Sequence, residues 1–241
     1  MAFLGHGRSL CGLRQALAVP GRIQQPAIVS SMQLRHASTT STSSQDTLSL
    51  ANLSAEQRQY LESALRVNQA GELAATRIYT AQTPPIVKAH PNLSSLMKHM
   101  YQQEAGHFDT FNALIAKHRI RPTAMYPVWQ AASTILGWST GMMGREAAMA
   151  CTEAVETEIG NHYNGQVREL FKWMQEAKEQ GKTVDLELTE LIDTIKRIRD
   201  EELEHLDHAV ENDAKEAQPY EPLTQVIRMG CRGAIWVSER V

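Results

Sequence analysis

The chain has 241 residues, enough for one sizeable domain and too few for two ordinary domains behind a long leader. Its formal net charge of −3 gives no indication of a nucleic-acid partner, and we expect none. Its three cysteines, Cys11, Cys151 and Cys231, are spaced too widely for a disulfide framework or a zinc cluster, which favours a reducing compartment.

Residues 1–45 have the composition of a mitochondrial transit peptide. They contain no Asp or Glu, carry four arginines and no lysine, and end in a run of Ser and Thr. Import uses such a segment as a positively charged amphipathic helix. A tail without a targeting role is the alternative. We therefore expect a leader at 1–45 and one folded domain at 46–241.

Two long helices are predicted after the leader. The first spans about 55–82, because Ser54 is a good N-cap and the two prolines at 84–85 are expected to end it. The second spans about 91–118, where apolar residues recur at steps of three, four and seven. Glu72 lies on or beside the apolar face of the first helix, although a lone helical glutamate is usually exposed to solvent.

An uncharged stretch of 23 residues, 122–144, follows the second helix. Its length would allow it to cross a bilayer, but it is too polar and too interrupted by proline and glycine for a typical transmembrane helix. Trp129 and Trp138 suit a segment that lies in the membrane interface. A helix packed in the bundle itself is an equally supported alternative.

The later helices are predicted at about 145–180, 184–213 and 220–241. Three glutamates of the first of these, Glu153, Glu156 and Glu158, compete for an inward position. Glu156 shares a face with Met149 and Tyr163 at heptad spacing, so we expect Glu156 to point into the bundle. The last helix could pack on the bundle or touch lipid.

The pattern Glu-x-x-His occurs twice, as Glu104 with His107 and as Glu202 with His205. Residues three apart leave the same face of a helix, and both pairs continue apolar stripes. Burying such carboxylates without counter-ions would be very costly. Two such pairs, with one lone glutamate from each of two other helices, form the ligand set of a ferritin-like di-metal bundle. Carboxylate and imidazole together suit iron or manganese.

Five stretches also form a specific set: 66–72 (RVNQAGE), 103–107 (QEAGH), 148–156 (AMACTEAVE), 161–164 (NHYN) and 199–207 (RDEELEHLD). Together with the C-terminal segment from Cys231 to Arg240, this set resembles the demethoxyubiquinone hydroxylases, the mitochondrial di-iron monooxygenases of ubiquinone biosynthesis. The likeness runs from about residue 55 to the end. It implies an all-α, ferritin-like four-helix bundle with a di-iron centre and extra C-terminal and interfacial helices.

The resemblance implies a reaction and its cofactors. A polyprenyl demethoxyquinone or its quinol would be hydroxylated on the ring with O2 and NADH-derived electrons, in the penultimate step of ubiquinone biosynthesis. His162 and Tyr163 match family positions tied to the quinone and to electron delivery. Electrons would pass through the bound quinone, which fits the lack of a Gly-x-Gly-x-x-Gly fingerprint. The two iron ions would be held by Glu72, Glu104, His107, Glu156, Glu202 and His205.

The resemblance also implies a place in the cell and partners. The protein would lie on the matrix side of the mitochondrial inner membrane as a peripheral protein, with a lipid-binding partner and a ubiquinone-biosynthesis complex. The stretch 122–144 would then admit a very apolar substrate. Asp200, Glu201 and Asp207 are candidates for contacts that orient the histidines.

Other functions fit parts of the pattern. A ferroxidase of the same fold would use similar ligands but needs no lipid-facing segment, and a non-catalytic quinone- or lipid-binding bundle needs no complete ligand set. A zinc hydrolase would need two closely spaced histidines, which the sequence lacks.

Overall fold

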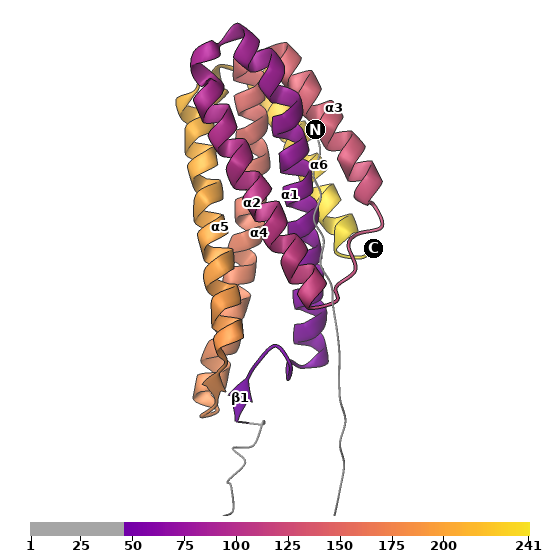
Figure 1. The fold of residues 1–241 in the computed structure, drawn as a ribbon, viewed down its shortest axis with the longest axis vertical. Coiled ribbons are helices and arrows are strands. Elements are labelled where there is room, and N and C mark those ends of the chain that lie inside the picture. The colour runs from indigo at the N-terminus through magenta and orange to yellow at the C-terminus, as the bar shows by residue number, and fades with distance from the viewer. Residues whose placement is uncertain (1–45) are drawn as a thin grey trace, which may run out of the picture. The chain divides into compact units, whose positions relative to one another are not determined.

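The computed structural model describes residues 46–241, so the predicted leader at 1–45 lies outside the described residues. The described part forms six α-helices, one pair of two-residue strands and two short 3-10 helices (Figure 1). The helices are α1 (Ala55–Ala89), α2 (Ser94–Lys117), α3 (Tyr126–Met143), α4 (Arg145–Glu179), α5 (Leu186–Glu211) and α6 (Tyr220–Ser238). The 3-10 helices are Pro91–Leu93 and Ala214–Glu216.

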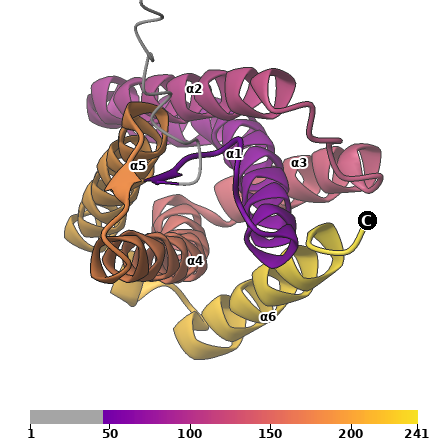
Figure 2. The same ribbon diagram turned by 90° about the horizontal axis from the view of Figure 1, so that it is seen from below.

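Four helices, α1, α2, α4 and α5, form the bundle, and α3 and α6 pack outside it (Figure 2). α3 lies mainly against α1, and α6 lies mainly against α4. The prediction of an all-α, ferritin-like bundle with extra helices is thereby confirmed.

Helix α1 starts where the sequence predicts and ends later. Ser54 forms a capping box, in which its hydroxyl accepts from the backbone N–H of Gln57. The prediction that the prolines end the helix near residue 82 is wrong, because α1 continues through Pro84 and Pro85. A proline inside a helix removes one backbone hydrogen bond and costs about 3 kcal/mol. Burial of Ile86, which is 1% exposed, favours continuation.

Two glycines allow α3 to lie very close to α1. A Cβ atom on Gly137 would be 2.5 Å from the carbonyl oxygen of Ile78. A Cβ atom on Gly141 would be 3.0 Å from the Cα atom of Gln82. The buried amide of Gln82 donates to the hydroxyl of Thr140 at 2.9 Å, so a polar contact accompanies this close approach. The uncharged stretch therefore forms a helix that packs on the bundle with one face.

The other face of α3 is exposed and apolar. Ile135 and Trp138 are 65% and 58% exposed. None of the described helices has the length and hydropathy that crossing a membrane would require. The face of α3 that packs on α1 agrees with a helix that belongs to the bundle. The exposed apolar face agrees with a segment that lies in the membrane interface.

A short parallel strand pair closes one end of the bundle. β1 (Thr47–Leu48) pairs with β2 (Thr183–Val184), and the backbone N–H of Asp185 donates to the carbonyl of Leu48 at 2.9 Å. The sequence analysis predicts no strand, since two residues are too few for an alternating pattern. The pairing ties the start of the domain to the connection between α4 and α5.

The core has a separate apolar cluster toward each end of the bundle. One contains Leu65, Phe111, Leu170, Leu188 and Ile195, and the other contains Tyr79, Met97, Met100, Met149 and Ala209. In each bundle helix the candidate metal ligands fall between these two clusters along the chain. The polar residues are therefore enclosed by apolar packing at both ends.

Candidate metal centre

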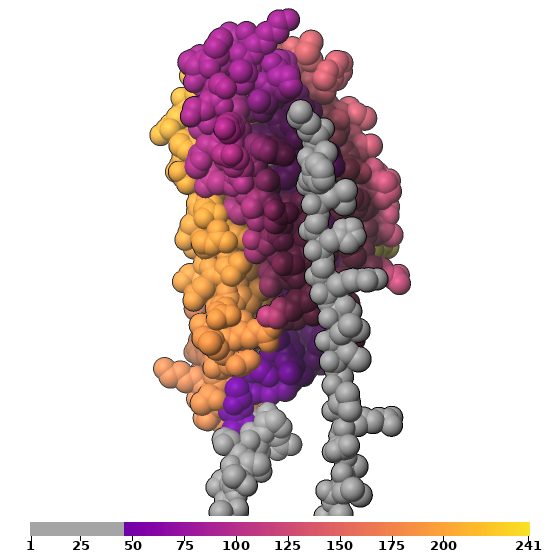
Figure 3. Space-filling model, viewed as in Figure 1, coloured from indigo at the N-terminus to yellow at the C-terminus, as the bar shows by residue number. Residues whose placement is uncertain are grey.

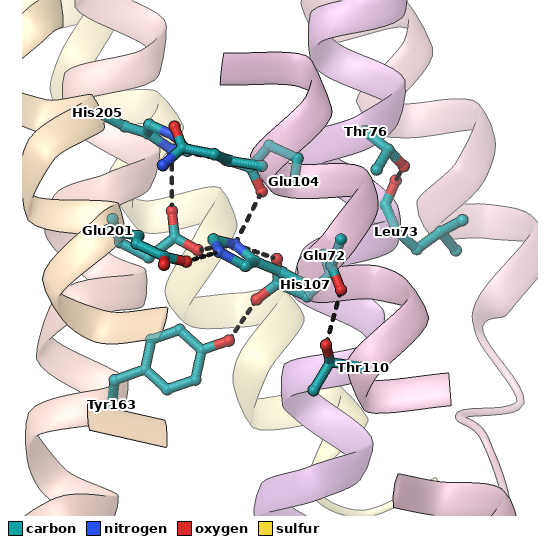
Figure 4. A network of polar contacts seen from close by, with 12 residues as sticks. Glu72, Leu73, Thr76, Glu104, His107, Thr110, Tyr163, Glu201 and His205 are labelled. Atoms are coloured by element: carbon teal, nitrogen blue, oxygen red, sulfur yellow. Dashed lines mark hydrogen bonds and ion pairs between the residues drawn. The ribbon is translucent and has the colours of Figure 1, made fainter. Parts of the chain in front are cut away.

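The six predicted ligands come together in the middle of the bundle, and Figure 4 labels four of them, Glu72, Glu104, His107 and His205. α1 and α4 each contribute one glutamate, and α2 and α5 each contribute a Glu-x-x-His pair. None of the six side chains is more than 2% exposed. Figure 3 shows the face of the molecule to which α2 and α5 contribute, the two helices that carry the Glu-x-x-His pairs. The residues are Glu72, Glu104, His107, Glu156, Glu202 and His205.

The ligand atoms fall into two groups that share two carboxylates. The group here called site A contains Glu72, Glu104, His107 and Glu202, and the group called site B contains Glu104, Glu156, Glu202 and His205. Within each group, one potential ligand atom per residue lies within 4.8 Å of all the others. Glu104 and Glu202 belong to both groups, so their carboxylates are placed to bridge two metal ions.

Each histidine turns Nδ1 toward the carboxylates. Nδ1 of His107 lies 3.0 Å from Glu202 Oε1 and 3.5 Å from Glu72 Oε2. Nδ1 of His205 lies 2.9 Å from Glu104 Oε1 and 3.2 Å from Glu202 Oε2. The same ring nitrogen thus faces the carboxylates on both helices.

The outer nitrogens of the two histidines are held by other side chains. Nε2 of His107 donates to Glu201 Oε2 at 2.6 Å, and Nε2 of His205 donates to Gln103 Oε1 at 3.0 Å. An oxygen acceptor keeps a proton on Nε2, so Nδ1 is the nitrogen that would lose its proton and bind a metal. Of the predicted orienting residues, Glu201 makes this contact, whereas Asp200 pairs with Arg199 at the surface. Sequence analysis missed Gln103.

A signal for Gln103 exists in the sequence. It directly precedes Glu104, just as Glu201 directly precedes Glu202. The equivalence of these two positions becomes apparent once the two Glu-x-x-His helices face each other.

The electrostatics of the cluster favour positive charge at its centre. Burial, together with the charge of Glu202, raises the pKa of Glu104 and Glu156 well above their usual range. Burial lowers the pKa of the histidines, but close contacts with the negatively charged carboxylates around them outweigh that effect. The pKa values rise to about 11 for His107 and about 10 for His205.

Several buried polar atoms of the cluster lack a partner in hydrogen-bond geometry among residues 46–241, although some of them lie at ion-pair distance from an imidazole nitrogen or a carboxylate oxygen. They are Glu72 Oε2, both oxygens of Glu104, Nδ1 of His107, Glu156 Oε2 and Glu202 Oε1. Unpaired buried carboxylate oxygens are costly, and metal ions would offset that cost. A set of carboxylate and imidazole donors fits iron or manganese.

The contacts of the three α4 glutamates agree with the prediction that Glu156 is the one that points into the bundle. Glu153 binds Lys215 and Tyr220, and Glu158 binds two arginines of α6. Glu156 alone of the three α4 candidates faces the other ligands.

Tyr163 and His162 lie beside the cluster but differ in what they contact. The phenol of Tyr163 donates to Glu72 Oε1, and its ring stacks on Phe111 with centroids 6.0 Å apart. Nε2 of His162 is buried and has no hydrogen-bond partner in the described part of the chain. Burial lowers the pKa of His162 to about 4, so its imidazole is neutral at neutral pH.

A largely apolar cavity of about 340 Å³ reaches the cluster between α1, α3, α4 and α6. Its lining includes Glu72, His162 and Tyr163, together with apolar residues of α3 and α6 such as Leu136 and Ile227. A larger depression of mixed polarity at the strand-pair end contains none of the six candidate ligands. The apolar cavity is therefore a route between the surface and the candidate metal centre.

Comparison with known proteins agrees with this site. The family model described as "Ubiquinone biosynthesis protein COQ7" matches residues 59–238. The chain belongs to this family. The match covers all six candidate ligands, His162 and Tyr163, and the predicted family is confirmed.

Curated relatives have names that agree with the family. The chain is 44% identical over 191 residues to the Saccharomyces cerevisiae "5-demethoxyubiquinone hydroxylase, mitochondrial", covering 79% of this chain and 82% of that protein. It is 40% identical over 194 residues to the Homo sapiens "NADPH-dependent 3-demethoxyubiquinone 3-hydroxylase, mitochondrial", covering 80% and 82%. It is 41% identical over 177 residues to the Rhodospirillum rubrum "3-demethoxyubiquinol 3-hydroxylase", covering 73% and 76%. The human name specifies NADPH, whereas the sequence analysis expects NADH.

Proposed function

We propose that this protein is a di-iron monooxygenase that hydroxylates the ring of a polyprenyl demethoxyquinone or its quinol in ubiquinone biosynthesis. One observation carries the proposal: an apolar cavity leads directly to Glu72 of a buried carboxylate and histidine cluster. Ferroxidase activity requires no such cavity. A non-catalytic lipid carrier requires no cluster of six buried ligand side chains. Family membership and the names of the relatives support the same reaction.

The cluster would hold the two metal ions and keep water away from them. Glu72 with His107 and Glu156 with His205 would bind one ion each, and Glu104 and Glu202 would bridge. Bound iron would supply the redox chemistry that activates O2, and O2 is the source of the oxygen atom that enters the ring. The protein positions the donors in advance and encloses them in apolar packing.

The apolar cavity would hold the substrate ring beside the cluster. Its volume suits a substituted ring with the first part of an isoprenoid tail. His162 and Tyr163 place polar groups at the inner end, whereas α3 and α6 supply apolar walls. The rest of a long tail would leave between α3 and α6.

A reduced nicotinamide nucleotide would supply the electrons. The sequence has no Gly-x-Gly-x-x-Gly fingerprint for a dinucleotide-binding domain. We infer that electrons reach the cluster through the quinone bound beside His162 and Tyr163. The relatives' names favour NADPH, and the assay below includes both nucleotides.

The outer faces of α3 and α6 would lie on the matrix side of the mitochondrial inner membrane. Both helices expose large apolar side chains next to the cavity walls. Contiguous exposed apolar surface marks a membrane or partner interface. A lipid-binding partner protein of the biosynthetic complex would use the same region. The exposed residues are Val128, Ile135, Trp138, Met142, Met143, Val226, Met229 and Trp236.

Metal content and ring hydroxylation together test the proposal. The purified protein should contain about two iron ions per chain, the number a ferritin-like carboxylate bundle holds. It should hydroxylate a short-tailed demethoxyquinone with O2 and either NADH or NADPH. Glu202→Ala should lose most of the metal and the activity. Stoichiometric zinc in the purified protein would contradict the proposal, and so would a folded protein that contains no metal or does not hydroxylate the quinone.

A further inference from the structure

The two histidines of the cluster are held from outside by a crossed pair of contacts. Gln103 of α2 binds His205 of α5, and Glu201 of α5 binds His107 of α2. Each holding residue directly precedes the bridging glutamate of its own helix. Figure 4 shows one of these contacts, between His107 and Glu201.

The geometry is alike on both sides, but the chemistry differs. His107 in site A donates to a carboxylate, whereas His205 in site B donates to a neutral amide. Hydrogen bonds to a charged acceptor are shorter and about twice as strong as neutral ones, and the two distances follow this order, 2.6 Å against 3.0 Å. A carboxylate behind an imidazole raises the basicity of the nitrogen that binds metal.

Two neighbouring contacts reduce the difference between the acceptors behind His107 and His205 but do not remove it. Arg197 binds Glu201 at 2.8 Å and shares part of its charge, but Arg197 is itself half exposed to water. Tyr163 donates a neutral hydrogen bond to one oxygen of Glu72 and leaves the other oxygen without a partner among the described residues. Site A therefore keeps a carboxylate oxygen in contact with its histidine, whereas the histidine of site B contacts a neutral amide.

We propose that the two metal positions are inequivalent: site A binds a divalent metal more tightly and fills first, with Glu201 as the positioning residue responsible. This inference rests on the metal centre proposed above. Each site otherwise has one terminal glutamate, one histidine and the two shared carboxylates. The difference in affinity is thus assigned to the residue behind each histidine.

Titration of the metal-free full-length protein with Co²⁺ under anaerobic conditions tests this assignment, because visible absorption bands of Co²⁺ report each coordination step. The wild-type protein should bind in two steps. Glu201→Gln keeps the size of the side chain and should weaken the first step about 10-fold or more, the usual effect of changing such an outer contact. Gln103→Glu should strengthen the second step.

Two further variants show which site each binding step belongs to, and a third serves as the control. Glu72→Gln should remove the first step and Glu156→Gln the second. Asp200→Asn removes a neighbouring charge that contacts Arg199 at the surface, and it should leave both steps unchanged. Two equal wild-type steps, or an unaltered first step in Glu201→Gln, would overturn the inequivalence. Absence of any Co²⁺ binding would instead overturn the metal centre itself.

Discussion

Tyr163 of α4 donates its phenolic hydrogen to one carboxylate oxygen of Glu72 on α1. The other oxygen, Oε2, lies 3.5 Å from Nδ1 of His107 and has no hydrogen-bond partner within residues 46–241. The tyrosine thus fixes the rotation of the carboxylate and directs its free oxygen into the cluster. The same phenol lines the apolar cavity, so it lies between the proposed substrate and the proposed metal.

Replacing Tyr163 by Phe should destabilise the metal-free protein by about 1.5–3 kcal/mol, the usual contribution of a hydrogen bond to a charged group. The ring would still stack on Phe111, so the loss isolates the hydroxyl. Urea unfolding measures the change. Tyr60→Phe is the matched control, because Tyr60 is 37% exposed and packs on Trp173. Equal effects of the two substitutions would show that the contact with Glu72 contributes nothing.

Gly137→Ala should destabilise the protein by about 1–3 kcal/mol, the range for overpacking. The new methyl group would be 2.5 Å from a backbone oxygen of Ile78, and backbone cannot move aside as a side chain can. Gly165→Ala on α4 is the control, because nothing lies within 4 Å of its added Cβ. That variant should be stabilised by up to about 1 kcal/mol through helix propensity. Denaturant unfolding of both variants measures these changes. An unchanged free energy of unfolding in Gly137→Ala would refute the close packing of α3.

Glu158→Gln should weaken the attachment of α6 to α4 above about pH 4.5, and less below it. Arg232 and Arg228 bind Glu158 and lower the pKa of its carboxyl below the usual value of 4.5. A lowered pKa in the folded state contributes stability above the unfolded pKa, and this contribution is lost as the pH falls through the folded pKa.

The free energy of unfolding of wild type and Glu158→Gln, measured at pH 7 and then at successively lower pH, checks this expectation. The gap between the two proteins should shrink as the pH falls below 4.5. A gap that stays constant would mean that the ion pairs do not hold α6.

The imidazole of His162 should titrate near pH 4 instead of near its usual value of 6.5, because burial against the apolar cavity disfavours its charged form. The associated stability is present above pH 6.5 and is lost as the pH falls toward 4. Proton NMR of the histidine ring signals, with His162→Gln to assign them, gives the midpoint. A midpoint near 6.5 would indicate that water reaches this wall of the cavity.

Replacing exposed apolar residues of α3 and α6 by glutamate should reduce binding to anionic phospholipid vesicles several-fold. Ile135→Glu and Trp236→Glu place charge on surfaces that we assign to the membrane. Leu186→Glu is the control, since Leu186 is 68% exposed but lies at the strand-pair end of α5. Co-sedimentation measures the effect, and equal loss in all three variants would refute a specific membrane face.

The sequence by itself determined the order of the helices, the fold class, the family and the six side chains that meet in the core. The family follows from the resemblance of five sequence stretches, whereas the other features depend on residues three to seven apart on one helix, and that spacing is local. The Glu-x-x-His pairs place both side chains on one face whatever the neighbouring helices do. Whether these side chains bind iron stays a prediction.

Only the tertiary structure decided which groups from different helices touch. Pro84 and Pro85 are local signals to stop a helix, yet the helix continues through them and buries Ile86 in the turn that follows. The pairing of β1 with β2 joins residues more than a hundred positions apart. The contact of Gln103 with His205, and the cavity between α3 and α6, exist because whole helices approach each other. The packing free energy of many side chains sets such distances, and no single stretch of sequence contains it.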